Sequence, residues 1–229
     1  MRGVVTYDTF SAVIGRIASD PFAAEVILAT GDLVQDETRA GYELFKRAMA
    51  PLNRPVLTLP GNHDSPDLMQ ELLTDEPFRV NGSHRFGDWS IVMLSSFTEG
   101  GDAGRLSDEE LERLDRSLAD NADAPTLICL HHQPIPMGSR WLDGVGLLNA
   151  HELLERVDAA PQVRGILWGH VHQASDRQRQ GVRLMSTPST CSQFLPNSDD
   201  FQMDSRPPAY RRLELRADGT IDSEVVWLD

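Results

Sequence analysis

The sequence predicts a layered α/β domain, and two observations carry that prediction. Four short apolar runs, rich in valine, isoleucine and leucine, each end in Asp, Asn or His. Runs of this length are typical of strands that are buried on both faces. Between them lie stretches with apolar residues three and four positions apart, which predict amphipathic helices. Strands that alternate with helices favour a sheet covered by helices.

The first predicted elements alternate in this way along the chain. Helices are expected at residues 11–18 and 37–50, and Pro51 ends the second. The four apolar runs are residues 25–32 (EVILATGD), 55–64 (PVLTLPGNHD), 126–132 (TLICLHH) and 163–172 (VRGILWGHVH).

Two later helices have start signals. Ser107 is followed by Glu110, and Asn149 by Glu152, which is the spacing of a capping box. Residues 211–215 and 220–228 flank Ala217-Asp218-Gly219 and predict a closing hairpin. Residues 196–208, rich in Pro and Asp, are expected to form a long loop. We expect one domain over residues 1–229.

Composition narrows the class of protein. Of 229 residues, 40% are hydrophobic and 24% are charged, which is ordinary for a globular domain. No apolar run approaches the roughly 18 residues of a membrane span, and the N-terminus lacks a secretory signal. Two cysteines give no disulfide framework, so a cytoplasmic protein is expected. The net charge of −14 disfavours nucleic acid as a partner, and an anionic ligand would need a local cation such as a metal.

Polar side chains follow the four apolar runs. Because loops at the carboxyl ends of strands face one crevice, we expect these side chains to meet. They are Asp32, Asn62, His63, His131, His170 and His172. Taken alone, the GD pair is most simply a turn, and the HH pair a strand end with one solvated histidine. Together, carboxylate, amide and imidazole ligands suit Mn, Fe, Zn or Co, and they predict a metal site.

These motifs resemble a known superfamily. GD, GNHD, HH and GHxH, in this order, are similar to the signatures of the calcineurin-like metallophosphoesterases. LATGDLVQD at residues 28–36, LHHQPIPMGSRWLD at 130–143 and STPSTCSQF at 186–194 look like the bacterial class III cyclic AMP phosphodiesterases. The resemblance implies a four-layer α/β/β/α sandwich, and an enzyme that hydrolyses 3′,5′-cyclic AMP to AMP with activated hydroxide.

The resemblance also implies a role for each ligand. Asp32 would bridge two divalent ions, iron or manganese with zinc or cobalt as alternatives. Asn62, His131 and His170 would complete one ion's site, and His172 would belong to the other.

Three residues would also contact the cyclic AMP substrate: Asn62, His63 and His172. His63 would donate a proton to the leaving oxygen, and Asp64 would orient its ring. We expect His132 to support the ligands rather than bind metal.

One signature of the superfamily is absent from the sequence. The family's first strand ends in Asp-x-His, and this chain has no such motif ahead of Asp32. Asp8, at the start of the first predicted helix, is not expected to replace it. A late start and a shortened relative with altered chemistry both explain the difference, and the intact later motifs favour the first. Without that strand we expect an unpaired sheet edge, exposed apolar surface and only Asp32 and His172 for the second ion.

Two rival functions are a phosphoesterase with another small substrate and a catalytically weak protein that binds a nucleotide or a partner. Several residues are candidates for substrate recognition, and each of them also has a simpler structural interpretation. Trp141 would stack on a base or only pack, and Arg140 would meet phosphate or stay solvated. Thr187, Ser189 and Thr190 would bind the ligand or only shape a turn.

Overall fold

The computed structural model describes residues 3–228. The helices are α1 (Thr6–Ala18), α2 (Arg39–Met49), η1 (Ala50–Leu52), α3 (Pro66–Leu72), α4 (Asp108–Asp120), α5 (Arg140–Asp143) and α6 (Ala150–Ala159). The strands before the middle of the chain are β1 (Ile27–Ala29), β2 (Val56–Thr58), β3 (Phe78–Val80), β4 (Gly82–Phe86), β5 (Trp89–Met93) and β6 (Thr126–Leu130). The remaining strands are β7 (Val163–Trp168), β8 (Ser175–Arg179), β9 (Val182–Ser186), β10 (Gln193–Phe194), β11 (Met203–Asp204), β12 (Ala209–Leu215) and β13 (Ile221–Trp227).

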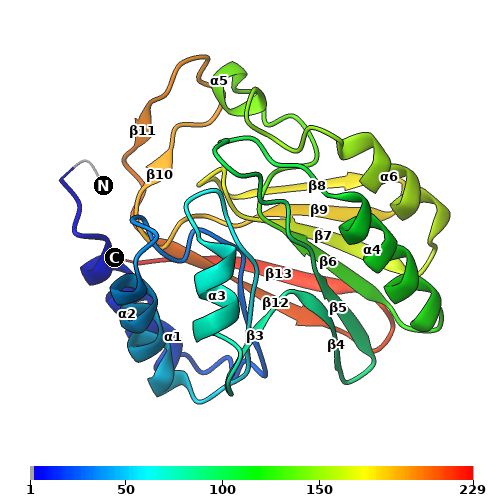
Figure 1. Ribbon diagram of the computed structural model, residues 1–229, viewed down its shortest axis with the longest axis horizontal. Helices are drawn as coiled ribbons and strands as arrows, with labels where there is room; N and C mark the ends of the chain where they lie inside the picture. Colours follow the sequence, from blue (N-terminus) through cyan, green and yellow to red (C-terminus); the bar gives the residue numbers. More distant parts are fainter. Residues whose placement is uncertain (1–2, 229) are drawn as a thin grey trace.

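These elements form the expected four layers (Figure 1). A six-stranded mixed sheet has the order β4-β5-β6-β7-β9-β8, and a three-stranded parallel sheet has the order β1-β2-β3. Helices α1, α2 and α3 pack on the outer face of the smaller sheet, while α4 and α6 pack on the outer face of the larger one. The α/β/β/α prediction is confirmed.

The side-chain alternation of β6 shows how the layers are made. Leu127 and Cys129 belong to the apolar cluster between the sheets, whereas Ile128 and Leu130 belong to the cluster under α4 and α6. Successive residues of a strand point to opposite faces, so a strand buried on both sides must be apolar throughout. This is why the continuous apolar runs of the sequence become central strands.

The helix starts match the predictions only in part. Ser107 Oγ accepts a hydrogen bond from Glu110 N at 3.3 Å, as expected at the start of α4. The Glu110 carboxylate, however, accepts from Ser95 N at 2.7 Å, so the capping box is only half formed. The cap expected at Asn149 is wrong, because its side chain pairs with the backbone N–H and carbonyl of Leu106 at 3.0 and 2.9 Å.

Two segments near the C-terminus complete the fold. β12 and β13 form the predicted hairpin as a separate two-stranded sheet. The loop expected at residues 196–208 is partly ordered instead, because β11 pairs with β10 and forms a small arm near α5 (Figure 1).

A cavity of about 1330 Å³ lies between β1 and β12. Among the described residues β1 pairs only with β2, so it is the sheet edge that we expected to be unpaired. No helix within residues 3–228 has the length and apolar character needed to cross a membrane.

Candidate metal centre

The predicted ligands converge at strand ends on one wall of this cavity. Asp32 follows β1, Asn62 follows β2, His131 follows β6, and both His170 and His172 follow β7. Three of them have left-handed backbones, with φ of 54° at Asp32, 59° at His170 and 47° at His172. Such conformations are uncommon for residues other than glycine and concentrate at functional sites. The tight turns aim the side chains at a common point.

Four ligand atoms meet at that point. His131 Nε2 lies 3.1 Å from Asn62 Oδ1, 3.2 Å from His170 Nδ1 and 3.3 Å from Asp32 Oδ2. Asn62 Oδ1 lies 3.0 Å from His170 Nδ1. The four residues come from four different strand ends, which confirms that the loops share one crevice.

The donor set fits a cation. His131 Nδ1–H donates to the carbonyl of Thr30 at 2.8 Å, so in the neutral ring Nε2 carries a lone pair. That lone pair faces Asn62 Oδ1, which also only accepts hydrogen bonds. Two acceptors at 3.1 Å repel unless a positive charge, a proton on Nε2 or a metal ion, lies between them. A divalent ion at this position would satisfy both, and the site therefore fits a metal.

The electrostatics of the site also fit a bound cation. Burial opposes charge on both partners of the Asp32–His131 pair, but their mutual attraction outweighs burial. It holds the pKa of Asp32 well below its usual range and raises the pKa of His131. Burial lowers the pKa of His170 to about 3 and of His172 to about 4, so both rings are neutral at pH 7. Neutral imidazoles are the form that binds metals.

His172 is fixed by contacts that the sequence did not reveal. Its Nδ1–H donates to the carbonyl of Ser192 at 2.7 Å, and its ring stacks on Phe194 with centroids 4.1 Å apart. As in His131, a backbone carbonyl takes Nδ1–H and leaves the Nε2 lone pair for a ligand. His172 lines the same cavity as the cluster formed by Asp32, Asn62, His131 and His170.

Comparison with known proteins identifies the family to which the chain belongs. The profile of the calcineurin-like phosphoesterases matches residues 4–174. The chain belongs to this family. It is therefore a hydrolase of the metallophosphoesterase type, from a family that uses divalent metals.

Curated relatives match almost the whole chain. "3',5'-cyclic adenosine monophosphate phosphodiesterase CpdA" of Haemophilus influenzae is 40% identical over 226 residues, which is 98% of this chain and 82% of that protein. The proteins of the same name are 41% identical in Escherichia coli K12, with the same two coverages, and 38% identical in Pseudomonas aeruginosa, with coverages of 100% and 84%.

Solved structures support the fold alone. A dimetal phosphatase from Danio rerio matches 96% of this chain and 88% of its own with a TM-score of 0.66 at 12% identity. The protein TT1561 of Thermus thermophilus matches 96% of this chain and 92% of its own with a TM-score of 0.60 at 15% identity.

Within this phosphoesterase fold, Asp64 does not orient the His63 ring. Asp64 is buried, and its carboxylate accepts from Gly61 N at 2.9 Å, Leu33 N at 3.1 Å and Tyr42 Oη at 3.0 Å. It thereby ties the loop after β1 to the loop after β2. Burial is the main reason that the pKa of Asp64 rises to about 6. Our sequence interpretation of its contact with His63 was wrong, because a motif gives adjacency but not side-chain direction.

His63 has a different partner for its ring. Its Nδ1 lies 3.3 Å from Gln35 Nε2, which donates, while its backbone N–H donates to Asp32 Oδ1 at 3.0 Å. The ring therefore keeps Nε2 for a ligand in the cavity. Gln35 lies within LATGDLVQD, in the loop after β1, but it was missed because the motif does not show which side chain meets the His63 ring.

His132 belongs to a second histidine arrangement. One ring nitrogen from each of His131, His132 and His170 lies within 4.8 Å of the other two, a grouping that is itself compatible with a metal. His132 Nδ1 is, however, 2.8 Å from Ser96 Oγ, and the ring packs so closely on Gly104 that an added Cβ would lie 2.2 Å from Nδ1. These contacts favour a supporting role.

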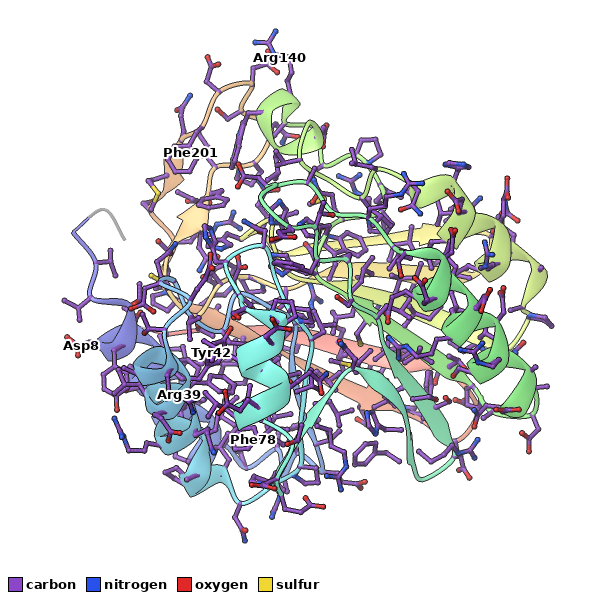
Figure 2. All side chains as sticks on the ribbon, in the orientation of Figure 1. Asp8, Arg39, Tyr42, Phe78, Arg140 and Phe201 are labelled. Atoms are coloured by element: carbon purple, nitrogen blue, oxygen red, sulfur yellow. The ribbon has the colours of Figure 1, made fainter. Side chains whose placement is uncertain are left out.

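The remaining substrate candidates differ in placement. Trp141 lines the cavity and packs on Phe194 and Phe201, with centroids 5.3 and 5.2 Å away. Figure 2 shows Arg140 and Phe201 at the same end of the molecule, and Arg140 is exposed. Ser189 is tied by its backbone to the Gln193 side chain at 2.9 and 2.8 Å, as in a shaped turn. Asp8 is exposed on α1 (Figure 2), as its exclusion from the ligands predicts.

Proposed function

We propose that this chain hydrolyses 3′,5′-cyclic AMP to 5′-AMP. The observation that carries the proposal is an identity of 38–41% over 98–100% of the chain with three bacterial proteins named as cyclic AMP phosphodiesterases. The site supports it, because the converging ligand atoms suit a divalent ion that would bind a phosphate diester. The net charge of −14 disfavours long nucleic acids and leaves a small nucleotide as the substrate.

The ligands divide into two groups. Asn62, His131 and His170 would hold one ion together with Asp32, and His172 would share a second ion with Asp32. Manganese and iron suit this mixture of carboxylate, amide and imidazole, as do zinc and cobalt. When bound, such ions neutralise phosphate oxygens and lower the pKa of water.

The protein's own residues then complete the reaction. Asn62 belongs to the cluster of candidate ligands, His63 and His172 line the same cavity, and all three would contact the phosphate. Water would add to phosphorus and lose a proton to solvent as the bond from phosphorus to O3′ breaks. His63 would give the proton on Nε2 to O3′, since Gln35 engages Nδ1 at 3.3 Å. The product is 5′-AMP with a free 3′-hydroxyl.

The proposal is tested by identifying the products that the chain and two of its variants form from two isomeric cyclic nucleotides. Purified chain with Mn²⁺ is given 3′,5′-cyclic AMP or 2′,3′-cyclic AMP, and nucleotides are separated by chromatography. We expect 5′-AMP from the first substrate, and a loss of about 100-fold or more in kcat for His63→Gln. His151→Gln changes an exposed histidine of α6 and is expected to keep full activity.

Two results would overturn the proposal. One is the lack of 5′-AMP from folded, manganese-loaded protein. The other is faster turnover of 2′,3′-cyclic AMP, which would favour another small phosphoester as the substrate.

A further inference from the structure

Three aromatic rings gather beside His172. Trp141 of α5, Phe194 of β10 and Phe201 of the loop before β11 pack edge to face, with centroids 5.2–5.3 Å apart and planes inclined by 69–73°. All three line the cavity that contains the candidate metal ligands. Phe194 is buried, whereas Trp141 and Phe201 are half-buried. The two half-buried rings therefore keep aromatic surface that a bound molecule can contact.

Phe194 joins this aromatic cluster to a candidate metal ligand. Its ring stacks on the imidazole of His172 with centroids 4.1 Å apart, and its backbone N–H donates to the carbonyl of His172 at 3.1 Å. The bond from His172 Nδ1 to the carbonyl of Ser192, at 2.7 Å, ties the same two segments a second time. The aromatic cluster thus has a fixed position, one side chain away from a residue that would hold the metal-bound phosphate.

The arm that carries Phe201 is fixed to the loop that carries Trp141. Trp141 N donates to the carbonyl of Asp199 at 3.2 Å, and Ser198 N donates to the buried hydroxyl of Ser139 at 3.2 Å. Figure 1 shows this arm, made of β10 and β11, beside α5. These bonds hold the two half-buried rings together before a ligand arrives, and a preformed site loses less entropy on binding.

The chemistry of the aromatic cluster suits a flat and uncharged ring. Its three members carry no charge, and the net charge of −14 disfavours an anion that lies away from a cation. A cyclic nucleotide has one part for each place: an anionic phosphate for the metal centre and, across the ribose, an uncharged base. Every base has a π face that can stack on aromatic side chains.

We propose that Trp141 and Phe201, supported by Phe194, form the binding site for the base of the cyclic nucleotide. The inference rests on the proposed phosphodiesterase function and adds the residues that recognise the part of the substrate that does not react. Stacking uses the face of the base rather than its hydrogen-bonding edge, so this site selects for the presence of a base. The simpler alternative is that the three rings only pack the arm against α5. The two interpretations predict different results for ligands that lack a base.

The first experiment measures binding without turnover. The probes are AMP and ribose 5-phosphate, which share the sugar and the phosphate, while only AMP carries a base. Their affinities are measured by titration calorimetry with manganese-loaded protein. We expect the unaltered chain to bind AMP at least about tenfold more tightly than ribose 5-phosphate. In Phe201→Ala and in Trp141→Ala this preference should fall by at least about fivefold, because each change removes a stacking surface.

Two controls separate stacking from packing. Met203→Ala removes an apolar side chain of the same arm that is 38% exposed and does not line the cavity, and it should keep the preference for AMP. Trp141→Phe keeps an aromatic face and should restore most of the preference that Trp141→Ala loses. Circular dichroism checks that each variant is folded.

The second experiment compares turnover of cyclic AMP with turnover of ribose 3′,5′-cyclic phosphate, which lacks the base. We expect the ratio of the two kcat/KM values to fall by at least about tenfold in Phe201→Ala and to change by less than about twofold in Met203→Ala. For cyclic AMP the loss should appear in KM rather than in kcat, because the base is bound equally before and during the reaction.

Three results would overturn the inference. They are binding of AMP by the unaltered chain no tighter than that of ribose 5-phosphate, an unchanged preference in both alanine variants, or an equal weakening of both ligands in those variants. Calorimetry tests the base site even if neither cyclic substrate is hydrolysed, a result that would overturn only the proposed phosphodiesterase function.

Discussion

The imidazole of His172 lies parallel to the ring of Phe194, with 9° between the planes and 4.1 Å between the centroids. Phe194 is 8% exposed and belongs to β10, so a buried aromatic face fixes the plane of a candidate metal ligand. The Ser192 carbonyl fixes the same ring at Nδ1. Together these contacts leave His172 little freedom to rotate.

Phe194→Ala is expected to lower phosphodiesterase kcat/KM by about 10- to 100-fold, because the His172 ring loses its stacking partner. Phe194→Tyr keeps the aromatic face and should restore most of the activity. Steady-state kinetics and manganese affinity, measured for both variants, check this. Equal losses in the two variants would show that Phe194 acts only through general packing.

Gly61 gives a steric prediction. A Cβ at this position would lie 2.1 Å from Asp32 Oδ1, so Gly61→Ala must displace the Asp32 carboxylate. We expect a loss of activity of at least about tenfold and weaker manganese binding, measured by titration. Gly15→Ala, in α1 with open space around its Cβ, is the matched control and should leave both quantities unchanged. Unaltered manganese affinity in Gly61→Ala would contradict a role for Asp32 as a ligand.

Replacement of Asp64 is predicted to lower the stability of the fold. Asp64→Ala leaves the buried backbone N–H of Gly61 and the partly buried N–H of Leu33 without their acceptor. We expect the free energy of unfolding in urea to fall by about 2–4 kcal/mol. Asp67→Ala, at an exposed position of α3, should change it by less than about 0.5 kcal/mol. A loss of activity without a loss of stability would instead assign Asp64 a direct part in the chemistry.

Asp20 gives a prediction for pH dependence away from the metal centre. Burial opposes its ionisation, but hydrogen bonds from Tyr210 and Arg212 outweigh burial and lower its pKa from 3.8 to about 2. A carboxyl with a lowered folded-state pKa stabilises the protein above the unfolded-state value, and this contribution is lost as the pH falls toward 2. Asp20→Asn should therefore be less stable than the natural chain at pH 7, and the difference should shrink at about pH 3.

Urea unfolding of both chains at the two pH values checks this prediction. A difference that stays constant or grows toward low pH would show that the Asp20–Arg212 contact does not depend on the charge of Asp20.

The convergence of the four candidate ligands could be predicted because each of them follows a strand. Asp32, Asn62, His131 and His170 each come directly after an apolar run, and parallel strands bring their carboxyl ends together. The contacts that orient these ligands were not predictable in this way. The bond from His131 to the Thr30 carbonyl joins residues 101 positions apart, and no local pattern encodes it.

Some missed elements did have a local signal. Gly87-Asp88 lies between the runs that become β4 and β5, and such a pair favours a hairpin turn. The capping boxes expected at Ser107–Glu110 and Asn149–Glu152 show the opposite error. There the sequence signal was present, but Asn149 and Glu110 do not form the capping bonds. Their spacing fits a capping box, but more distant partners, Leu106 and Ser95, take their side chains. Side-chain partners are decided by the tertiary fold, whereas periodicity reports only which face is buried.

The most direct test of the metal centre is the anomalous scattering of manganese in crystals grown with Mn²⁺. The account predicts an anomalous peak coordinated by Asp32, Asn62, His131 and His170. A peak coordinated by His132 in place of Asn62 and Asp32, or no peak among these residues, would contradict it.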